Sequence, residues 1–199
     1  MKTQFKITGL FYELQGCKFR KYLDIKKAKT ALKSPDLMVI MMNPGSSRAK
    51  DGIDNNTIES EAVPDNTQSQ IMKVMLSSGL EYARVLNLSD IREPKSNEFY
   101  KKMSELESKS IAHSIFDNSR FEDFNDLFVP NTPVIYGWGV SANLKPLALK
   151  AISACNISNT YGILKPNTTW AYYHPLPPIY IKQQEWVEKL SRQLIGFHK

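Results

Sequence analysis

The sequence predicts an α/β fold with three layers, α/β/α, in which helices cover both faces of a mostly parallel central sheet. Beyond residue 36, short runs of apolar and β-branched residues alternate with longer segments whose apolar residues recur at helical spacing. This alternation is typical of parallel strands that are joined by crossover helices. The length of 199 residues suits one domain, and we therefore expect residues 1–199 to form a single α/β domain.

Residues 1–30 lie before this alternation and follow a different pattern. Partial alternation of apolar and polar residues around 11–13 and 19–25 predicts one or two antiparallel strands. The basic segment 26–33 suits a short exposed helix or a turn. We expect these N-terminal strands and this helix to pack on the core of the same domain.

The first core strand is the most distinct element of the sequence. Residues 37–42 are six apolar residues in a row, which predicts a strand buried on both faces. The run ends at Asn43-Pro44-Gly45, where Pro44 disfavours helical geometry at Asn43. The following residues, 46–66, are polar without a clear period, and we expect them to form a long loop.

The remaining elements alternate as the predicted fold requires. Gly79 is suited to end the first of their helices, and Ser96 and Ser141 are suited to cap two others. Pro146 fits poorly in a helix interior, so we expect the helix after Ser141 to start late or to bend. The predicted elements are, in order, a helix at 67–78, a strand at 83–88, helices at 96–116 and 120–128, a strand at 134–136, a helix at 141–155, a strand at 168–173 and a helix at 182–197.

The composition narrows the class of protein. Cys17 and Cys155 are far apart and lack the spacing of a zinc site, so we expect no disulfide framework, no metal and a cytoplasmic location. No apolar segment is long enough to cross a membrane, and the first residues do not resemble a signal peptide. The net charge of +6 is compatible with a polyanionic partner such as DNA, but equally with an ordinary soluble protein.

Polar residues or glycines follow all four of the predicted core strands. In open parallel sheets, ligands bind outside the carboxyl ends of the strands, where the following loops meet. The four strand ends are therefore expected to converge on one face, and this convergence predicts the functional site. The residues concerned are Asn43-Pro44-Gly45, Asn87, Gly137-Trp138-Gly139 and His174-Pro175.

Two of these side chains suit nucleobase chemistry, although each also has a purely structural interpretation. The amide of Asn87 is able to pair with the edge of a base or to cap a neighbouring loop. The imidazole of His174 is able to donate a hydrogen bond to a developing anion or to a backbone carbonyl. The proline-rich segment that follows is stiff and could direct Leu176 or Ile179 outward into a duplex. The sequence contains no hydrolase triad pattern, P-loop or complete dinucleotide fingerprint.

The order of these motifs resembles that of a bacterial family described as domain of unknown function 1643. The resemblance covers roughly residues 17 to 180. The family motifs are matched by Met41-Met42-Asn43-Pro44-Gly45-Ser46, Asp65-Asn66-Thr67, Val85-Leu86-Asn87-Leu88, Trp138-Gly139 and His174-Pro175-Leu176. This resemblance implies an order of motifs and no activity.

More distantly, the same positions resemble the pocket of the uracil-DNA glycosylase superfamily. The resemblance implies that Asn43 positions a water, that Asn87 recognises the pyrimidine and that His174 polarises the base. Asn43 and His174 are then the catalytic residues. The substrate-binding residues under this interpretation are Pro44, Gly45, Asn87, Trp138, Tyr173 and Leu176.

The chain departs from the superfamily pattern in two places. Leu176 occupies the position of a serine that binds phosphate in these glycosylases, although a leucine there could still enter the minor groove. No aromatic residue lies between Asn43 and Tyr82, the segment that usually supplies the ring on which the extruded base stacks. The rings that could substitute are those of Tyr136, Trp138 and Tyr173.

Three functions follow from these patterns. The first is an N-glycosylase that acts on a nucleobase in DNA or in nucleotides, in which a carboxylate such as Asp51, Asp54 or Asp90 assists Asn43. The second is a non-catalytic nucleic-acid-binding protein on the same scaffold, and the third is an enzyme of small nucleosides. In each case the sequence predicts no cofactor and no membrane partner, and a monomer is favoured.

Overall fold

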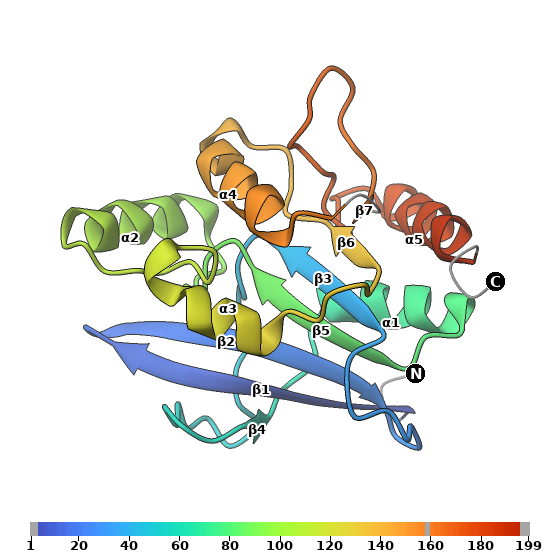
Figure 1. Ribbon diagram of the computed structural model, residues 1–199, viewed down its shortest axis with the longest axis horizontal. Helices are drawn as coiled ribbons and strands as arrows, with labels where there is room; N and C mark the ends of the chain where they lie inside the picture. Colours follow the sequence, from blue (N-terminus) through green and yellow to red (C-terminus); the bar gives the residue numbers. More distant parts are fainter. Residues whose placement is uncertain (1–3, 158–159, 196–199) are drawn as a thin grey trace.

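The structure is a computed structural model that describes residues 4–157 and 160–195. Within these residues, seven strands form one mixed sheet in the order β4-β1-β2-β5-β3-β6-β7 (Figure 1). The strands are β1 (Phe5–Leu14), β2 (Cys17–Lys27), β3 (Leu37–Met41), β4 (Ser60–Glu61), β5 (Tyr82–Asn87), β6 (Val134–Tyr136) and β7 (Thr160–Tyr161). The helices are α1 (Asn66–Ser78), α2 (Ser96–Ser108), α3 (Phe121–Leu127), α4 (Lys145–Cys155) and α5 (Tyr180–Leu194).

The sheet is parallel in one half only, so the expectation of a mostly parallel sheet is wrong. β5, β3, β6 and β7 are parallel, as predicted for the alternating part of the chain. β4, β1 and β2 are antiparallel, and β2 joins this half to the other by pairing with β5. The N-terminal strands therefore extend the sheet instead of packing on it, because the free edge of β5 offers them unpaired backbone groups.

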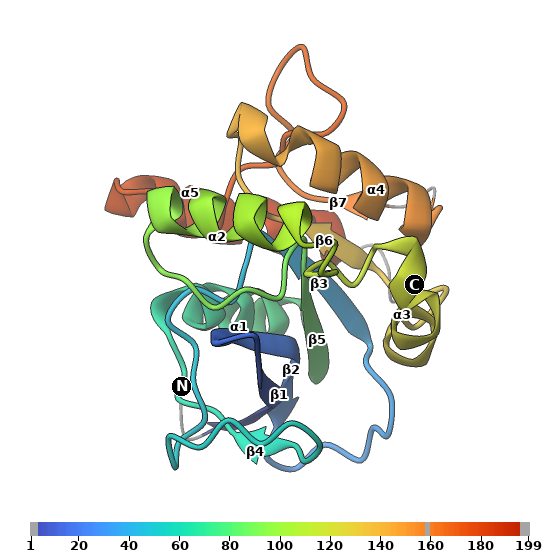
Figure 2. The ribbon, with the colours of Figure 1, turned by 90° about the vertical axis from the view of Figure 1, so that its left-hand side faces the viewer.

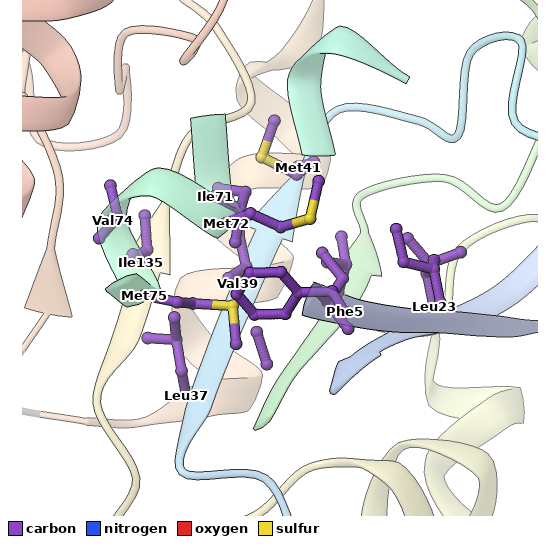
Figure 3. Packing of buried hydrophobic residues seen from close by; sticks show 14 of the residues in the cluster. Phe5, Leu23, Leu37, Val39, Met41, Ile71, Met72, Val74, Met75 and Ile135 are labelled. Carbon is purple, nitrogen blue, oxygen red and sulfur yellow. The ribbon is translucent and has the colours of Figure 1, made fainter. Parts of the chain in front are cut away.

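Alternate side chains of β3 belong to two separate hydrophobic clusters, one on each face of the sheet. Leu37, Val39 and Met41 point toward α1 and α5, whereas Met38 and Ile40 point toward α2, α3 and α4. Figure 3 shows the first cluster, in which Met72 and Met75 of α1 lie over Val39. All five residues of β3 are buried, because the strand has neighbours on both edges and helices on both faces.

The predicted fourth core strand at 168–173 is not a strand of the sheet. The two-residue strand β7 takes that place beside β6. Residues 164–172 instead fold back on themselves, with a turn at Asn167 (φ 61) and isolated pairings of Tyr172 with Leu164 and Gly139. This segment stands away from the sheet at the top of Figures 1 and 2. Its residues have high β propensity, but the turn at Pro166-Asn167 makes them pair locally.

Several predicted helix boundaries are confirmed and others are wrong. α1 ends at Gly79 (φ 74), as expected. α2 ends at Ser108 and not at residue 116, because the chain turns at Ser110 with a φ of 55. Pro146 lies in the first turn of α4, where its missing N–H is tolerated, and a short 3-10 helix (Ala142–Leu144) precedes it.

The remaining corrections concern caps and ends. Neither Ser96 nor Ser141 makes a side-chain cap, since the position before α2 is Lys95 and Ser141 precedes the 3-10 helix without a capping bond. Residues 28–33 form turns and irregular backbone, so the helix considered for 26–33 is absent. The predicted end of the last helix at Phe197 lies outside the described residues.

The long loop after β3 covers the outer edge of the antiparallel half. Its strand β4 pairs with Thr8 and Gly9 of β1, and the N–H of Ala62 donates to the carbonyl of Ile7 (3.0 Å). Further along, the side chain of Asn56 accepts a hydrogen bond from the N–H of Glu13 (3.0 Å). Figure 2 shows this loop along β1 at the bottom of the molecule. The segment predicted as a long loop is therefore tied to β1 at residues 7–9 and again at Glu13.

Candidate functional site

A cleft of about 780 Å³ opens at the carboxyl ends of β3, β5 and β6. Its walls are the loops after β3 and β6, the first turn of α1 and the proline-rich segment before α5. Every predicted site residue contributes to its lining, namely Asn43, Pro44, Gly45, Asn87, Trp138, Tyr173, His174 and Leu176. A second hollow of about 440 Å³, between α1 and α5, contains none of these residues. Three of the four predicted strand ends converge here as topology predicts, whereas His174 reaches the cleft from a segment outside the sheet.

Asn43 ties the end of β3 to the loop that precedes α2. Its Nδ2 donates hydrogen bonds to the backbone carbonyls of Ile91 (3.1 Å) and Glu93 (2.7 Å). Both amide hydrogens are therefore occupied, and Oδ1 accepts no hydrogen bond from the described residues. An amide held in this way offers the cleft a fixed acceptor for a water or an N–H group.

Gly45 lets the chain turn away from β3 directly after Asn43. Its φ of 59 lies in the left-handed region, which glycine adopts without steric cost. The preceding Pro44 is buried, so its packing restrains the Asn-Pro-Gly segment between the end of β3 and the turn at Gly45. The local sequence therefore fixes the backbone that carries the amide of Asn43.

His174 carries a hydrogen-bond donor that is free to act in the cleft. Its Nδ1 accepts a hydrogen bond from the backbone N–H of Leu176 (3.1 Å). A neutral ring with an acceptor at Nδ1 carries its proton on Nε2, and no described group accepts from that atom. Burial lowers the pKa of His174 below its ordinary value, which favours this neutral form near pH 7.

Asn87 and Arg20 meet at the closed end of the cleft. Asn87 ends β5 and is only 1% exposed, and its Oδ1 accepts a hydrogen bond from Nη2 of Arg20 (2.8 Å). Arg20 comes from β2, the antiparallel strand beside β5. No sequence pattern pointed to Arg20, because its place in the site depends on a strand pairing between segments about 60 residues apart, as between Asp24 and Arg84.

None of the three carboxylates considered as a partner of Asn43 lines the cleft. Asp51 accepts a hydrogen bond from the N–H of Ile53 in its own turn. Asp54 forms ion pairs with Arg92 and Lys18. Asp90 is fully buried, where it accepts hydrogen bonds from Tyr12 and Arg120. These three side chains have structural partners, so their assignment to the site is wrong.

The carboxylate that does line the cleft, besides the ion-paired Glu93, is Asp65. It caps α1, with Oδ1 accepting from the N–H of Gln68 (2.8 Å) while the side chain of Gln68 accepts from the N–H of Asp65 (3.1 Å). This is a capping box, and its Asp-x-x-Gln spacing is visible in the sequence. Asp65 could therefore have been found from that pattern at the start of the first helix after β3.

The aromatic lining differs from the expected one. Trp138 has no exposed surface, and its Nε1 donates to the carbonyl of Trp170 (2.8 Å), so its ring belongs to the cleft wall and is not open for stacking. Tyr136 is buried and does not line the cleft. Tyr173 is 41% exposed, and Tyr100 of α2 also lines the cleft, with its hydroxyl donating to Ser141 (3.0 Å). Tyr173 and Tyr100 are thus the rings available for stacking.

The segment after His174 presents apolar side chains at the rim. Leu176 is half-buried in the cleft lining, whereas Ile179 is 61% exposed and is followed by the exposed Tyr180 and Ile181. Gly137 allows this segment to pack closely, since a Cβ there would lie 3.3 Å from Cδ of Pro175. Of the two residues considered for insertion into a duplex, Ile179 is the one that projects.

Among residues 4–157 and 160–195, no cluster of three or more His, Cys, Asp or Glu side chains could bind a metal ion. In the same residues, no helix is both long and apolar enough to cross a membrane. Comparisons of the chain with protein-family models, with curated proteins and with solved structures find no match.

Proposed function

We propose that the protein is a nucleobase N-glycosylase, built on a three-layer scaffold like that of uracil-DNA glycosylases, that hydrolyses the bond between base and sugar in DNA or in nucleotides. The observation that carries the proposal is the hydrogen bond from the N–H of Leu176 to Nδ1 of His174, which leaves Nε2 of this cleft residue as the donor. When the bond breaks, the base leaves with the bonding electron pair and becomes anionic. A preorganised donor that faces this charge stabilises the transition state.

The attacking water has two partners in the cleft. The fixed Oδ1 of Asn43 orients the water but cannot accept its proton, whereas the carboxylate of Asp65 can do so. The water oxygen forms a bond to the anomeric carbon of the sugar, the carbon–nitrogen bond to the base breaks, and the water proton passes to Asp65. This hydrolysis, as written, consumes only water and needs no cofactor.

The remaining cleft residues suit an extruded base. The buried Nδ2 of Asn87 lacks a partner and is a donor for an oxo group of the base. Tyr173 and Tyr100 supply rings for stacking, and Ile179, which is exposed and follows the cleft-lining Pro178, is the apolar side chain available to fill the gap that an extruded base leaves. The net charge of +6 favours contact with phosphates.

The test is a single-turnover assay with single- and double-stranded oligonucleotides that carry uracil, hypoxanthine or a thymine mismatch, followed by alkali to cleave abasic sites. We expect strand cleavage with the native protein and a loss of about 100-fold or more in His174→Ala. Gln184→Ala, on the exposed part of α5 and outside the cleft, is the control and is expected to keep the full rate. An undiminished rate in His174→Ala would contradict the proposal.

A second function, nucleic-acid binding without cleavage, is favoured by a different observation. The amide of Asn43 holds the loop before α2, so this residue has a structural role that needs no reaction. Binding that weakens as salt rises, without any product, would identify this function. Saturable binding of free nucleosides with none for oligonucleotides would instead indicate an enzyme of small nucleosides, for which a cleft of about 780 Å³ is large enough.

A further inference from the structure

The closed end of the cleft contains three buried polar atoms that have no hydrogen-bond partner among the described residues, and all three are donors. They are Nε of Arg20, Nε2 of Gln68 and Nδ2 of Asn87. The three side chains are 3%, 4% and 1% exposed. Buried donors are nearly always paired in native proteins, so three unpaired donors in one cleft indicate a missing acceptor.

Chemistry fixes the orientation of both amides. Oδ1 of Asn87 accepts from a guanidinium, and Oε1 of Gln68 accepts from the backbone N–H of Asp65. Guanidinium and backbone N–H groups only donate, so the amide oxygens must face them. The NH₂ groups are therefore the ones that remain for a ligand.

Arg20 also lacks a charge partner. Among the described residues, no carboxylate forms a salt bridge with its guanidinium. The charges of Asp65 and Asp90 act on Arg20 from a distance, but neither forms a salt bridge with it, since Asp90 is paired with Arg120 and Asp65 accepts from the N–H of Gln68. Burial lowers the pKa of Arg20 to about 10, a value at which the side chain stays charged near pH 7. Buried charges in proteins are normally paired, and an incoming anion would supply the pair.

We propose that the closed end of the cleft binds an anionic, oxygen-bearing edge of a planar ligand, and that Arg20 selects for it. The inference rests on the proposed function for the identity of this ligand as a nucleobase. Such a base carries an oxo group next to a second, negatively charged oxygen, as in 5-carboxyuracil. An amino group at this edge, as in cytosine, would place donors against donors.

Matched ligands test the proposal in binding equilibria that require no cleavage. Calorimetric titration of the full chain compares 5-carboxyuracil with uracil, which has the same ring without the carboxylate, and with cytosine and inorganic phosphate. We expect 5-carboxyuracil to bind at least about tenfold more tightly than uracil, and cytosine to bind most weakly. Equal affinity for inorganic phosphate would overturn the assignment of a planar edge.

Arg20→Met removes the charge and keeps most of the side-chain length. We expect it to reduce the affinity for 5-carboxyuracil to that of uracil, while the melting temperature without ligand stays the same or rises. Asn87→Asp places a carboxylate beside Arg20 and is expected to abolish anion binding and raise the melting temperature. Arg192→Met makes the same chemical change on the exposed part of α5 and serves as the control.

A fall in melting temperature of Arg20→Met with unchanged ligand affinity would overturn the proposal, because Arg20 would then be a structural residue. The failures of the two proposals are distinguishable. Arg20-dependent anion binding without glycosylase activity rejects the proposed function and keeps the anion site. Glycosylase activity in the native protein, together with equal affinity of Arg20→Met and native protein for 5-carboxyuracil, supports the proposed function and rejects the anion site.

Discussion

At the scale of residues, the cleft depends on side chains whose hydrogen bonds leave one atom free. Asn43 uses both amide hydrogens and keeps Oδ1, while His174 uses Nδ1 and keeps its Nε2–H. Asn43, Asn87 and Trp138 were found because they lie at or after the ends of sheet strands, a property that topology converts into proximity. His174 was found through a predicted strand that the sheet does not contain. Arg20 was missed because it lies within a strand, in a segment whose partner is distant along the chain.

The tautomer and pKa of His174 are measurable directly. Its folded-state pKa is lowered by burial, so the unfolded chain binds the proton more readily. The neutral ring therefore contributes its full stability above about pH 6.5, the ordinary pKa of histidine. This contribution is lost as the pH falls from there through the lower pKa of the folded state. Nitrogen-detected NMR should show the Nε2–H tautomer at pH 7.5 and a midpoint below 6.5, with His174→Gln to assign the signal. A midpoint at or above 6.5 would show that the ring is not held neutral.

Asp65 permits a separation of stability from chemistry. Asparagine caps helices as well as aspartate does, so Asp65→Asn should keep the free energy of unfolding within about 0.5 kcal/mol. Asp65→Ala removes the capping box and should cost about 1 kcal/mol. If Asp65 accepts the proton of water, both variants lose glycosylase activity to a similar extent. If Asp65→Asn keeps its glycosylase activity and only the destabilised Asp65→Ala loses it, Asp65 acts in capping alone.

At the scale of elements, periodicity predicted the long or fully buried segments and failed for the short ones. β3, α1, β5 and β6 were found because burial imposes a regular pattern on their residues. β7 has two residues, which are too few to show any period. Residues 168–173 have the composition of a strand, yet the turn beside them determines their pairing. A high β propensity shows that a segment can form a strand, whereas the contacts around it determine whether that strand joins the sheet.

The join between β3 and the loop before α2 is a further element-level prediction. Asn43→Ala removes two hydrogen bonds to backbone carbonyls and should lower the free energy of unfolding by about 1–3 kcal/mol. Asn43→Asp should lower it further, because carboxylate oxygens would then face the carbonyls of Ile91 and Glu93. Urea denaturation measures both, with Asn97→Ala on the exposed face of α2 as the control. Equal stability of Asn43→Asp and the native protein would contradict this account.

At the scale of the whole molecule, the antiparallel and parallel halves meet at a buried ion pair as well as at backbone bonds. Asp24 of β2 accepts hydrogen bonds from Nε (2.8 Å) and Nη2 (2.9 Å) of Arg84 on β5, and a third from Tyr82. This bidentate contact fixes the register across the join. The sequence could not reveal the join, because β2 and β5 are separated by β3 and a long loop.

Removing one partner of this pair should affect the entire fold. Asp24→Ala leaves Arg84 largely buried without its carboxylate and should cost about 3–5 kcal/mol in the free energy of unfolding. Glu185→Ala, which removes an exposed ion pair on α5, should change it by less than about 0.5 kcal/mol. Guanidinium denaturation of the two variants provides the comparison. A cost for Asp24→Ala as small as that for Glu185→Ala would mean that the join relies on backbone pairing alone.

The loop after β3 has a consequence for how copies of the chain behave in concentrated solution. The same segment that begins at the cleft with Asn43-Pro44-Gly45 and returns to it at Asp65 also bonds to the outer edge of β1 at residues 7–9 and at Glu13. A bare ten-residue strand edge would be a template for strand addition by another molecule. Shortening residues 50–58 should therefore promote self-association that sedimentation velocity detects. Variation in this loop is constrained by solubility as well as by whatever the cleft binds.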